Sequence, residues 1–253
     1  MSKYNQYDHF AADKQQRLIK GQSLPHSYVE KPAMRKMLPD LLGQKVLMLG
    51  CGTGEESRLL EEKGAAELVG IDKSTVSIEL AKKTYPGHTF RSGDINDLVF
   101  DNESFDFVYS SLAINYTGKP KNVYKEAYRV LKKGGKFQFS VPHPVRWASE
   151  RIIIEGKPAR ILGFEEVKGE SRVFGNYNDY LEYSHELTIS DEDPIRFWVG
   201  SPSMHFRLLK ETGFKIEDFV ETKAIEETKT VDPNYYARFS KLPQFTLFLA
   251  TKP

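Results

Sequence analysis

The chain has one cysteine, no long apolar run and almost no net charge, and each of these absences excludes a class of protein. Because Cys51 stands alone among 253 residues, an internal disulfide and a cluster of thiolate metal ligands are excluded. No apolar stretch approaches the roughly 18 residues of a transmembrane helix, and the N-terminus lacks the apolar core of a signal peptide. The net charge of +1 comes without the basic stripe of a nucleic-acid or membrane-surface binder. We therefore expect a cytoplasmic protein without a nucleic-acid or membrane partner.

The composition is that of a globular protein. Hydrophobic residues make up 40% and charged residues 28% of the chain. The length suits one large domain or one domain with an insertion.

Residues 46–54 organise the rest of the sequence. Four apolar residues, Val46 to Leu49, read as a buried strand of a parallel sheet. Gly50, Gly52 and Gly54 follow at alternating positions, and a helix then opens with acidic residues in its first turn, where the helix dipole favours them. A strand, a glycine loop and a helix predict the start of a nucleotide-binding unit.

The spacing of the glycines separates this loop from the usual dinucleotide fingerprint. That fingerprint requires a third glycine at position 55, which is Glu55 here. A second apolar strand, residues 68–72, ends in Asp72 about 20 residues past the glycines, where a carboxylate can accept hydrogen bonds from both ribose hydroxyls.

These motifs resemble those of the class I S-adenosylmethionine-dependent methyltransferases, in which an apolar strand runs into G-C-G-T-G. Residues 131–135 (LKKGG) before a strand and the closing residues 247–253 are further similarities, so the resemblance covers about residues 30–141 and 199–253. It implies an α/β fold with a Rossmann-like, seven-stranded, mostly parallel sheet, an antiparallel C-terminal edge strand and helices on both faces. It also implies S-adenosylmethionine as cofactor and a small molecule as methyl acceptor.

We expect a single methyltransferase domain over residues 1–253, with two additions. Residues 1–28 form either a lid over the substrate pocket or a helix packed on the domain. Residues 145–198 are rich in aromatic and charged residues and fit the strand–helix alternation poorly. We interpret them as an inserted cap that binds the acceptor, or as an insertion with a small core of its own.

The resemblance assigns cofactor contacts to matching positions. The glycine loop approaches the cofactor, Asp72 takes the ribose with Lys73 along the adenosine edge, and Asp94 with the amide of Ile95 takes the adenine. Residues after the fourth strand lie near the sulfonium, and Tyr28 reaches the methionine end. The full set is Tyr28, Gly50, Cys51, Gly52, Gly54, Asp72, Lys73, Asp94, Ile95, Ser110, Ser111 and Leu112.

One position departs from the family pattern. Most relatives have an acidic residue two positions before the first glycine, which braces the loop and the amino end of the cofactor. This chain has Met48 there, so those polar groups need another partner, for which Glu55 is a candidate.

Methyl transfer is an in-line displacement, and a base is needed only if the acceptor must lose a proton. His143, held between Pro142 and Pro144 at the end of a strand, is our candidate base, although it can also simply shape the pocket. Tyr116 is a candidate for orienting the acceptor. We expect no metal, because no carboxylates cluster around the fourth strand.

Two other functions stay open at this point. One is a nicotinamide-dependent oxidoreductase, which the glycine spacing and the absence of a second nucleotide-binding half disfavour. The other is a protein that binds the adenosyl cofactor without transferring a methyl group. The identity of the acceptor, the atom methylated and the oligomeric state are not defined by the sequence, with a homodimer as one option.

Overall fold

The computed structural model describes residues 23–181, 185–188 and 196–253, which build a seven-stranded sheet in the order β12-β13-β5-β4-β1-β2-β3. Strand β13 runs antiparallel to both of its neighbours, while β5, β4, β1, β2 and β3 pair in parallel. The strands are β1 (Lys45–Leu49), β2 (Glu67–Asp72), β3 (Thr89–Ser92), β4 (Phe105–Ser110), β5 (Leu131–Pro142), β12 (Lys215–Glu221) and β13 (Phe245–Thr251). The predicted fold class is confirmed, with the reversed strand β13 lying one place inside the edge strand β12.

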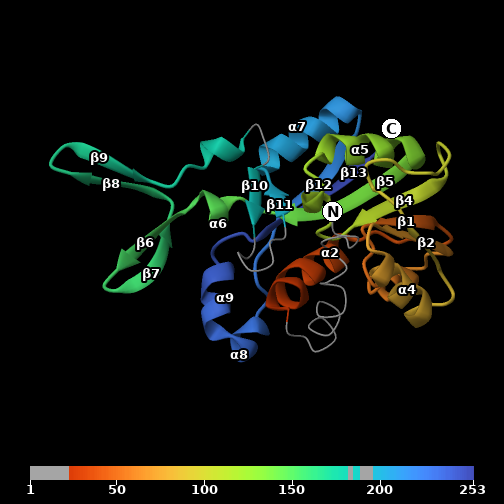
Figure 1. Ribbon diagram of the computed structural model, residues 1–253, viewed down its shortest axis with the longest axis horizontal. Coiled ribbons are helices and arrows are strands. Elements are labelled where there is room, and N and C mark those ends of the chain that lie inside the picture. The colour runs from red at the N-terminus through yellow and green to blue at the C-terminus, as the bar shows by residue number, and fades with distance from the viewer. Residues whose placement is uncertain (1–22, 182–184, 189–195) are drawn as a thin grey trace, which may run out of the picture.

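Helices cover both faces of the sheet (Figure 1). Helices α5 (Pro120–Val130) and α7 (Pro202–Thr212) pack on one face, where Leu47 and Val108 point. The opposite face carries α2 (Lys31–Met37), α3 (Ser57–Glu62), α4 (Thr75–Thr84) and α9 (Pro233–Phe239). The short α8 (Thr228–Val231) directly precedes α9 in the chain. Because successive strand residues point to opposite faces, Val46, Met48 and Phe107 join that second core.

The order of the strands reverses at β1. It pairs with β2 on one side and with β4 on the other, so the chain leaves the carboxyl ends of β1 and β4 in opposite directions across the sheet. In open α/β sheets ligands bind in the crevice outside such a switch point. The glycine loop that follows β1 lies at this place.

Local sequence signals set several helix ends. The Ser74 hydroxyl accepts a 3.0 Å hydrogen bond from the Ser77 N–H at the start of α4, and Ser201 does the same for the Met204 N–H at the start of α7. Gly213 ends α7 in the left-handed conformation, with φ of 104°.

The segment between β5 and α7 forms separate small elements. After α6 (Val145–Ala148), the hairpins β6–β7 (Glu150–Ile154, Lys157–Ile161) and β8–β9 (Gly163–Val167, Glu170–Phe174) project from the sheet, at the left of Figure 1. The 3-10 turn η3 (Asn178–Tyr180) and a third hairpin, β10 (His185–Thr188) with β11 (Arg196–Val199), follow. Ala148, Tyr180, Phe197 and Val199 bury one another in a small core.

The described part of the chain begins at Ser23, so most of the expected N-terminal lid lies outside it. The first described elements are a π-helical turn, η1 (His26–Glu30), and α2, which continues it. None of the helices in the described ranges has both the length and the hydropathy of a membrane span.

Candidate functional site

A pocket of about 610 Å³ opens at the switch point between β1 and β4. This volume lies within the usual range for small-molecule sites. Six predicted site residues meet in its wall, namely Gly50, Asp72, Lys73, Asp94, Ile95 and Tyr116. The wall also contains Ala113, after the fourth strand, and Trp198, from the segment interpreted as a cap. Sequence reasoning missed the other lining residues, namely Gly93, Asn96, Asp97, Thr117, Lys119 and Asn122.

The Asp72 carboxylate is held in place by two backbone amides. Its Oδ2 accepts a 2.8 Å hydrogen bond from the N–H of Gly52, and its Oδ1 accepts one of 2.8 Å from the N–H of Ser74. A carboxylate oxygen has room for a further hydrogen bond, so both oxygens keep a lone pair for a ligand. The carboxylate is therefore fixed to the glycine loop and still able to receive a vicinal diol such as that of a ribose.

Asp94 sits in a polar turn after β3. Its Oδ1 accepts hydrogen bonds from the backbone N–H (2.9 Å) and the side-chain amide (2.7 Å) of Asn96, and the Lys73 ammonium lies 3.6 Å from Oδ2. Burial by itself would raise the pKa of Asp94, but these hydrogen bonds and the Lys73 charge outweigh it and hold the pKa below its usual value.

Asn96 adds an acceptor beside Asp94. Its Oδ1 is buried without a hydrogen-bond partner, which buried polar atoms rarely are. An orphaned carbonyl oxygen in a pocket wall suits a ligand N–H, such as the exocyclic amino group of adenine. In the sequence, the only signal for it is the turn-forming run from Gly93 to Asn96.

The glycine loop approaches its neighbours closely. Gly50, Gly52 and Gly54 all have positive φ, of 65°, 53° and 81°. A Cβ on Gly50 would lie 2.2 Å from the Ala113 Cβ, so the loop after β1 and the loop after β4 are in direct contact. Only a residue without a side chain permits this approach.

Cys51, Gly52 and Gly54 shape the loop rather than line the pocket wall. Burial, and then the nearby Asp72 charge, raises the pKa of the Cys51 thiol well above its ordinary value. The thiol is therefore protonated at neutral pH and unsuited to nucleophilic chemistry.

The residues after β4 organise that loop through their polar groups. Ser110 Oγ donates to the Leu49 carbonyl (3.1 Å), and the Leu112 N–H donates to Ser140 Oγ (3.0 Å). Leu112 has φ of 46°, a strained value for a residue with a side chain. Ser110, Ser111 and Leu112 are not part of the pocket wall.

Glu30 is a buried carboxylate that sequence reasoning missed. It has no exposed surface, and its Oε1 accepts hydrogen bonds from Ser111 Oγ (2.8 Å) and Ser140 Oγ (2.6 Å). Burial would raise the pKa of Glu30, but His26 and the two hydroxyls together hold it below its usual value. Glu30 therefore carries its negative charge at the carboxyl ends of β4 and β5.

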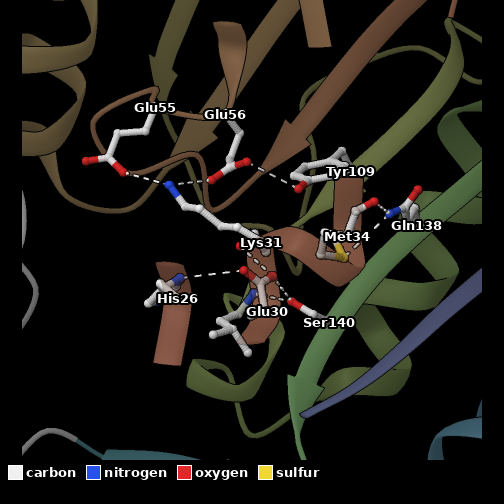
Figure 2. Close-up of polar contacts among 11 residues, drawn as sticks. His26, Glu30, Lys31, Met34, Glu55, Glu56, Tyr109, Gln138 and Ser140 are labelled. Carbon is white, nitrogen blue, oxygen red and sulfur yellow. Dashed lines mark hydrogen bonds and ion pairs between the residues drawn. The ribbon is translucent and has the colours of Figure 1, made fainter. Parts of the chain in front are cut away.

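Lys31, the first residue of α2, forms ion pairs with two acidic residues that follow the glycine loop (Figure 2). Its ammonium lies 3.2 Å from Glu55 Oε2 and 3.0 Å from Glu56 Oε1. Burial raises the pKa of Glu56, and Lys31 offsets only part of this effect. Met48, where the family resemblance implies an acidic residue, is 2% exposed, and its sulfur accepts a contact from the Ser57 hydroxyl at 3.9 Å.

Both ring nitrogens of His143 are engaged. Nδ1 accepts a hydrogen bond from the Val145 N–H (3.2 Å), so the ring proton is on Nε2, which donates to Glu221 Oε1 at 2.8 Å. Burial lowers the pKa of His143 and Glu221 opposes this in part, so the imidazole is neutral at pH 7. A role as base requires Nδ1 to leave the Val145 amide. His143 is not part of the pocket wall, whereas Tyr116 is.

Tyr28 lies within η1, is half-buried and is not part of the pocket wall. Its carbonyl oxygen accepts a hydrogen bond from the Ile225 N–H. Within the described ranges, no three His, Cys, Asp or Glu side chains are placed to hold a metal ion together.

Comparisons with known proteins place this geometry in a class. Residues 47–139 match a family model described as "Methyltransferase domain". A demethylmenaquinone methyltransferase of Renibacterium salmoninarum is 33% identical over 164 residues, which are 62% of this chain and 65% of that protein. A malonyl-[acyl-carrier protein] O-methyltransferase of Salmonella typhimurium is 30% identical over 118 residues, 46% of this chain and 47% of that protein. Several curated relatives are matched over about half of their length.

A solved structure extends the similarity over most of the chain. An S-adenosylmethionine-dependent methyltransferase of Mesorhizobium loti superposes with a TM-score of 0.67 and 26% identity, covering 88% of this chain and 97% of that one. Residues 47–139 thus form a methyltransferase domain, and the fold is that of the class I S-adenosylmethionine-dependent methyltransferases. The family resemblance predicted from the sequence is thereby confirmed.

Proposed function

We propose that this protein transfers a methyl group from S-adenosylmethionine to a small-molecule acceptor. The observation that carries the proposal is the Asp72 carboxylate, fixed by the Gly52 and Ser74 amides in the wall of the pocket that also contains Asp94. The family match and the named activities of the relatives support it.

The pocket residues fit the cofactor. Asp72 would hold the ribose hydroxyls, Asp94 and Asn96 would hold the adenine edge, and Gly50 would line the pocket beside the chain that leads from the ribose. When bound, S-adenosylmethionine supplies a methyl group activated by a sulfonium, with a neutral thioether as leaving group. The protein therefore needs no acid for the leaving group, and its main task is to hold the acceptor in line.

The far wall of the pocket would hold the acceptor. Tyr116, Thr117, Asn122 and Trp198 combine aromatic surface with hydroxyl and amide groups, which suits a partly apolar small molecule. We assign Tyr116 to orienting the acceptor. We place the enzyme in the cytoplasm, acting on a small molecule rather than on nucleic acid, in line with the net charge of +1.

A base is required only for an acceptor that must lose a proton. We retain His143 in this role, with Glu221 stabilising the imidazolium that would form. The acceptor would then have to displace the Val145 amide from Nδ1.

Calorimetry tests the cofactor on which the proposal depends. Wild-type protein and Asp72→Ala would be titrated with S-adenosylmethionine, S-adenosylhomocysteine and NADH, and thermal melts would verify that the variant folds. We expect micromolar binding of the two adenosyl ligands that Asp72→Ala weakens at least tenfold. Binding of NADH alone would refute the proposal and favour an oxidoreductase.

A further inference from the structure

The Glu30 carboxylate lies at the carboxyl ends of β4 and β5, beside the switch point, and is fully buried. The two hydroxyls that bind it belong to Ser111, directly after β4, and Ser140, near the end of β5. Asp72 ends β2, on the other side of β1 in the sheet. A ligand whose ribose rests on Asp72 and whose chain passes Gly50 therefore extends from β2 toward the loop that Glu30 supports.

One oxygen of this carboxylate lacks a donor. Glu30 Oε2 is buried without a hydrogen-bond partner, and so is His26 Nδ1, 3.6 Å away and beyond hydrogen-bonding distance. Buried carboxylate oxygens are nearly always paired, since an unpaired one loses its hydration without replacement. The atom that is missing is a hydrogen-bond donor, and for an ionised carboxylate a cationic donor fits best.

The neighbouring lysine does not supply that cation. The Lys31 ammonium lies between Glu55 and Glu56, on the glycine-loop side of the helix, and Figure 2 shows it pointing away from Glu30. The charge of Lys31 is thus matched by two other carboxylates, and the His26 imidazole, 3.6 Å from Glu30 Oε2, forms an ion pair with Glu30 only when it is protonated.

The residue type at Met48 indicates which cation Glu30 could bind. The resemblance to the class I methyltransferases implies an acid at this position that braces the amino end of the cofactor, and here a buried thioether stands instead. Glu30 is presented by the π-helical turn η1, and single π-helical turns are frequent at functional sites.

On the basis of the proposed function, we propose that Glu30 binds the ammonium group of the methionine end of S-adenosylmethionine. The anion for this group thus comes from the helix before β1 and not from β1 itself. Ser111 and Ser140 hold Oε1, and this leaves Oε2 to accept the hydrogen bond from the ammonium.

A ligand pair tests this on the wild-type protein by calorimetry. S-adenosyl-3-thiopropylamine carries the amino group without the carboxylate, and 5′-propylthio-5′-deoxyadenosine has the same chain without the nitrogen. We expect the amine to bind at least tenfold more tightly. Equal affinity of the two compounds overturns the proposal.

Glu30→Gln tests the residue itself, with Glu79→Gln on the exposed side of α4 as the matched control. We expect Glu30→Gln to weaken S-adenosylhomocysteine and the amine at least tenfold and to leave the propylthio compound unchanged. A similar loss for all three ligands, or no loss, overturns the proposal. If thermal melts show that Glu30→Gln does not fold, the ligand pair on the wild type decides.

Failure of the proposed function looks different from failure of this assignment. A wild-type protein that binds none of the three adenosyl compounds refutes the cofactor site as a whole, and this assignment with it. A wild-type protein that binds the propylthio compound and the amine equally well retains the adenosyl site and refutes only the role of Glu30.

Discussion

The Cβ atom that Gly50 lacks would lie 2.2 Å from the Cβ of Ala113. This contact joins the loop after β1 to the loop after β4, and both residues line the pocket. Gly52, two positions on, also has positive φ but has open space where its Cβ would be. The two glycines are therefore needed for different reasons, conformation alone at Gly52 and conformation plus contact at Gly50.

Alanine substitutions at Gly50 and at Gly52 should separate the cost of the backbone conformation from the cost of the close contact. We expect Gly52→Ala to reduce the free energy of unfolding by about 1–2 kcal/mol, the cost of left-handed backbone for an L-residue. Gly50→Ala should reduce the free energy of unfolding by about 1–3 kcal/mol more, because its Cβ would clash with that of Ala113. Urea unfolding measures both. The double variant Gly50→Ala/Ala113→Gly should recover the second loss, and no recovery would show that the loops do not meet in this way.

Trp198 should report ligand binding by fluorescence. It lines the pocket, packs against Gly118 and is one of two tryptophans in the chain. We expect S-adenosylhomocysteine or an acceptor to change the emission of the wild type and of Trp147→Phe. Trp198→Phe should abolish the change. A ligand-dependent change that survives in Trp198→Phe, but not in Trp147→Phe, would place the ligand against the other tryptophan.

His143→Gln should separate catalysis from cofactor binding. Because His143 lies outside the pocket wall, we expect the dissociation constant for S-adenosylhomocysteine to change less than twofold. With an acceptor identified by screening, kcat should fall about 10²-fold or more if the acceptor must lose a proton. The acidic limb of the pH–kcat profile should also disappear. An unchanged kcat for such an acceptor would exclude His143 as the base.

His205 should make stability depend on pH. It is buried, its Nδ1 lies 2.6 Å from the Tyr124 hydroxyl, and burial lowers its pKa to about 3. Below the ordinary histidine pKa near ~6.5 the unfolded chain binds a proton that the folded chain does not, so stability falls by about 1.4 kcal/mol per pH unit until about pH 3. Above pH 7 His205 is neutral in both the folded and the unfolded chain, so it no longer lowers the free energy of unfolding.

The measurement is urea unfolding of wild type and His205→Asn between pH 6.5 and 5, where carboxylates titrate little. We expect the wild type to lose stability more steeply than the variant, by about 1 kcal/mol per pH unit. Parallel slopes would mean that His205 takes up a proton equally in both states. Curves recorded above pH 7.5 serve as the reference, because there the two slopes should coincide.

The sequence by itself determined the features that depend on neighbouring residues. A buried strand needs a run of apolar residues, a tight loop needs glycines with positive φ, and a helix start needs a side chain such as that of Ser74 or Ser201. These rules span a few positions, so they placed the glycine loop and the acid at Asp72. The seven-stranded sheet itself followed from the resemblance to the class I methyltransferases that these motifs carry.

Only the tertiary structure decided which distant side chains meet. Glu30 binds hydroxyls 81 and 110 positions further along the chain, and His143 meets a carboxylate 78 positions away. No local pattern indicates such pairs, because burial and the partner together determine whether an acid near a helix start is solvated or held in the core. The same is true of Ala113 against Gly50, where the packing of two loops turned a permissive glycine into a required one.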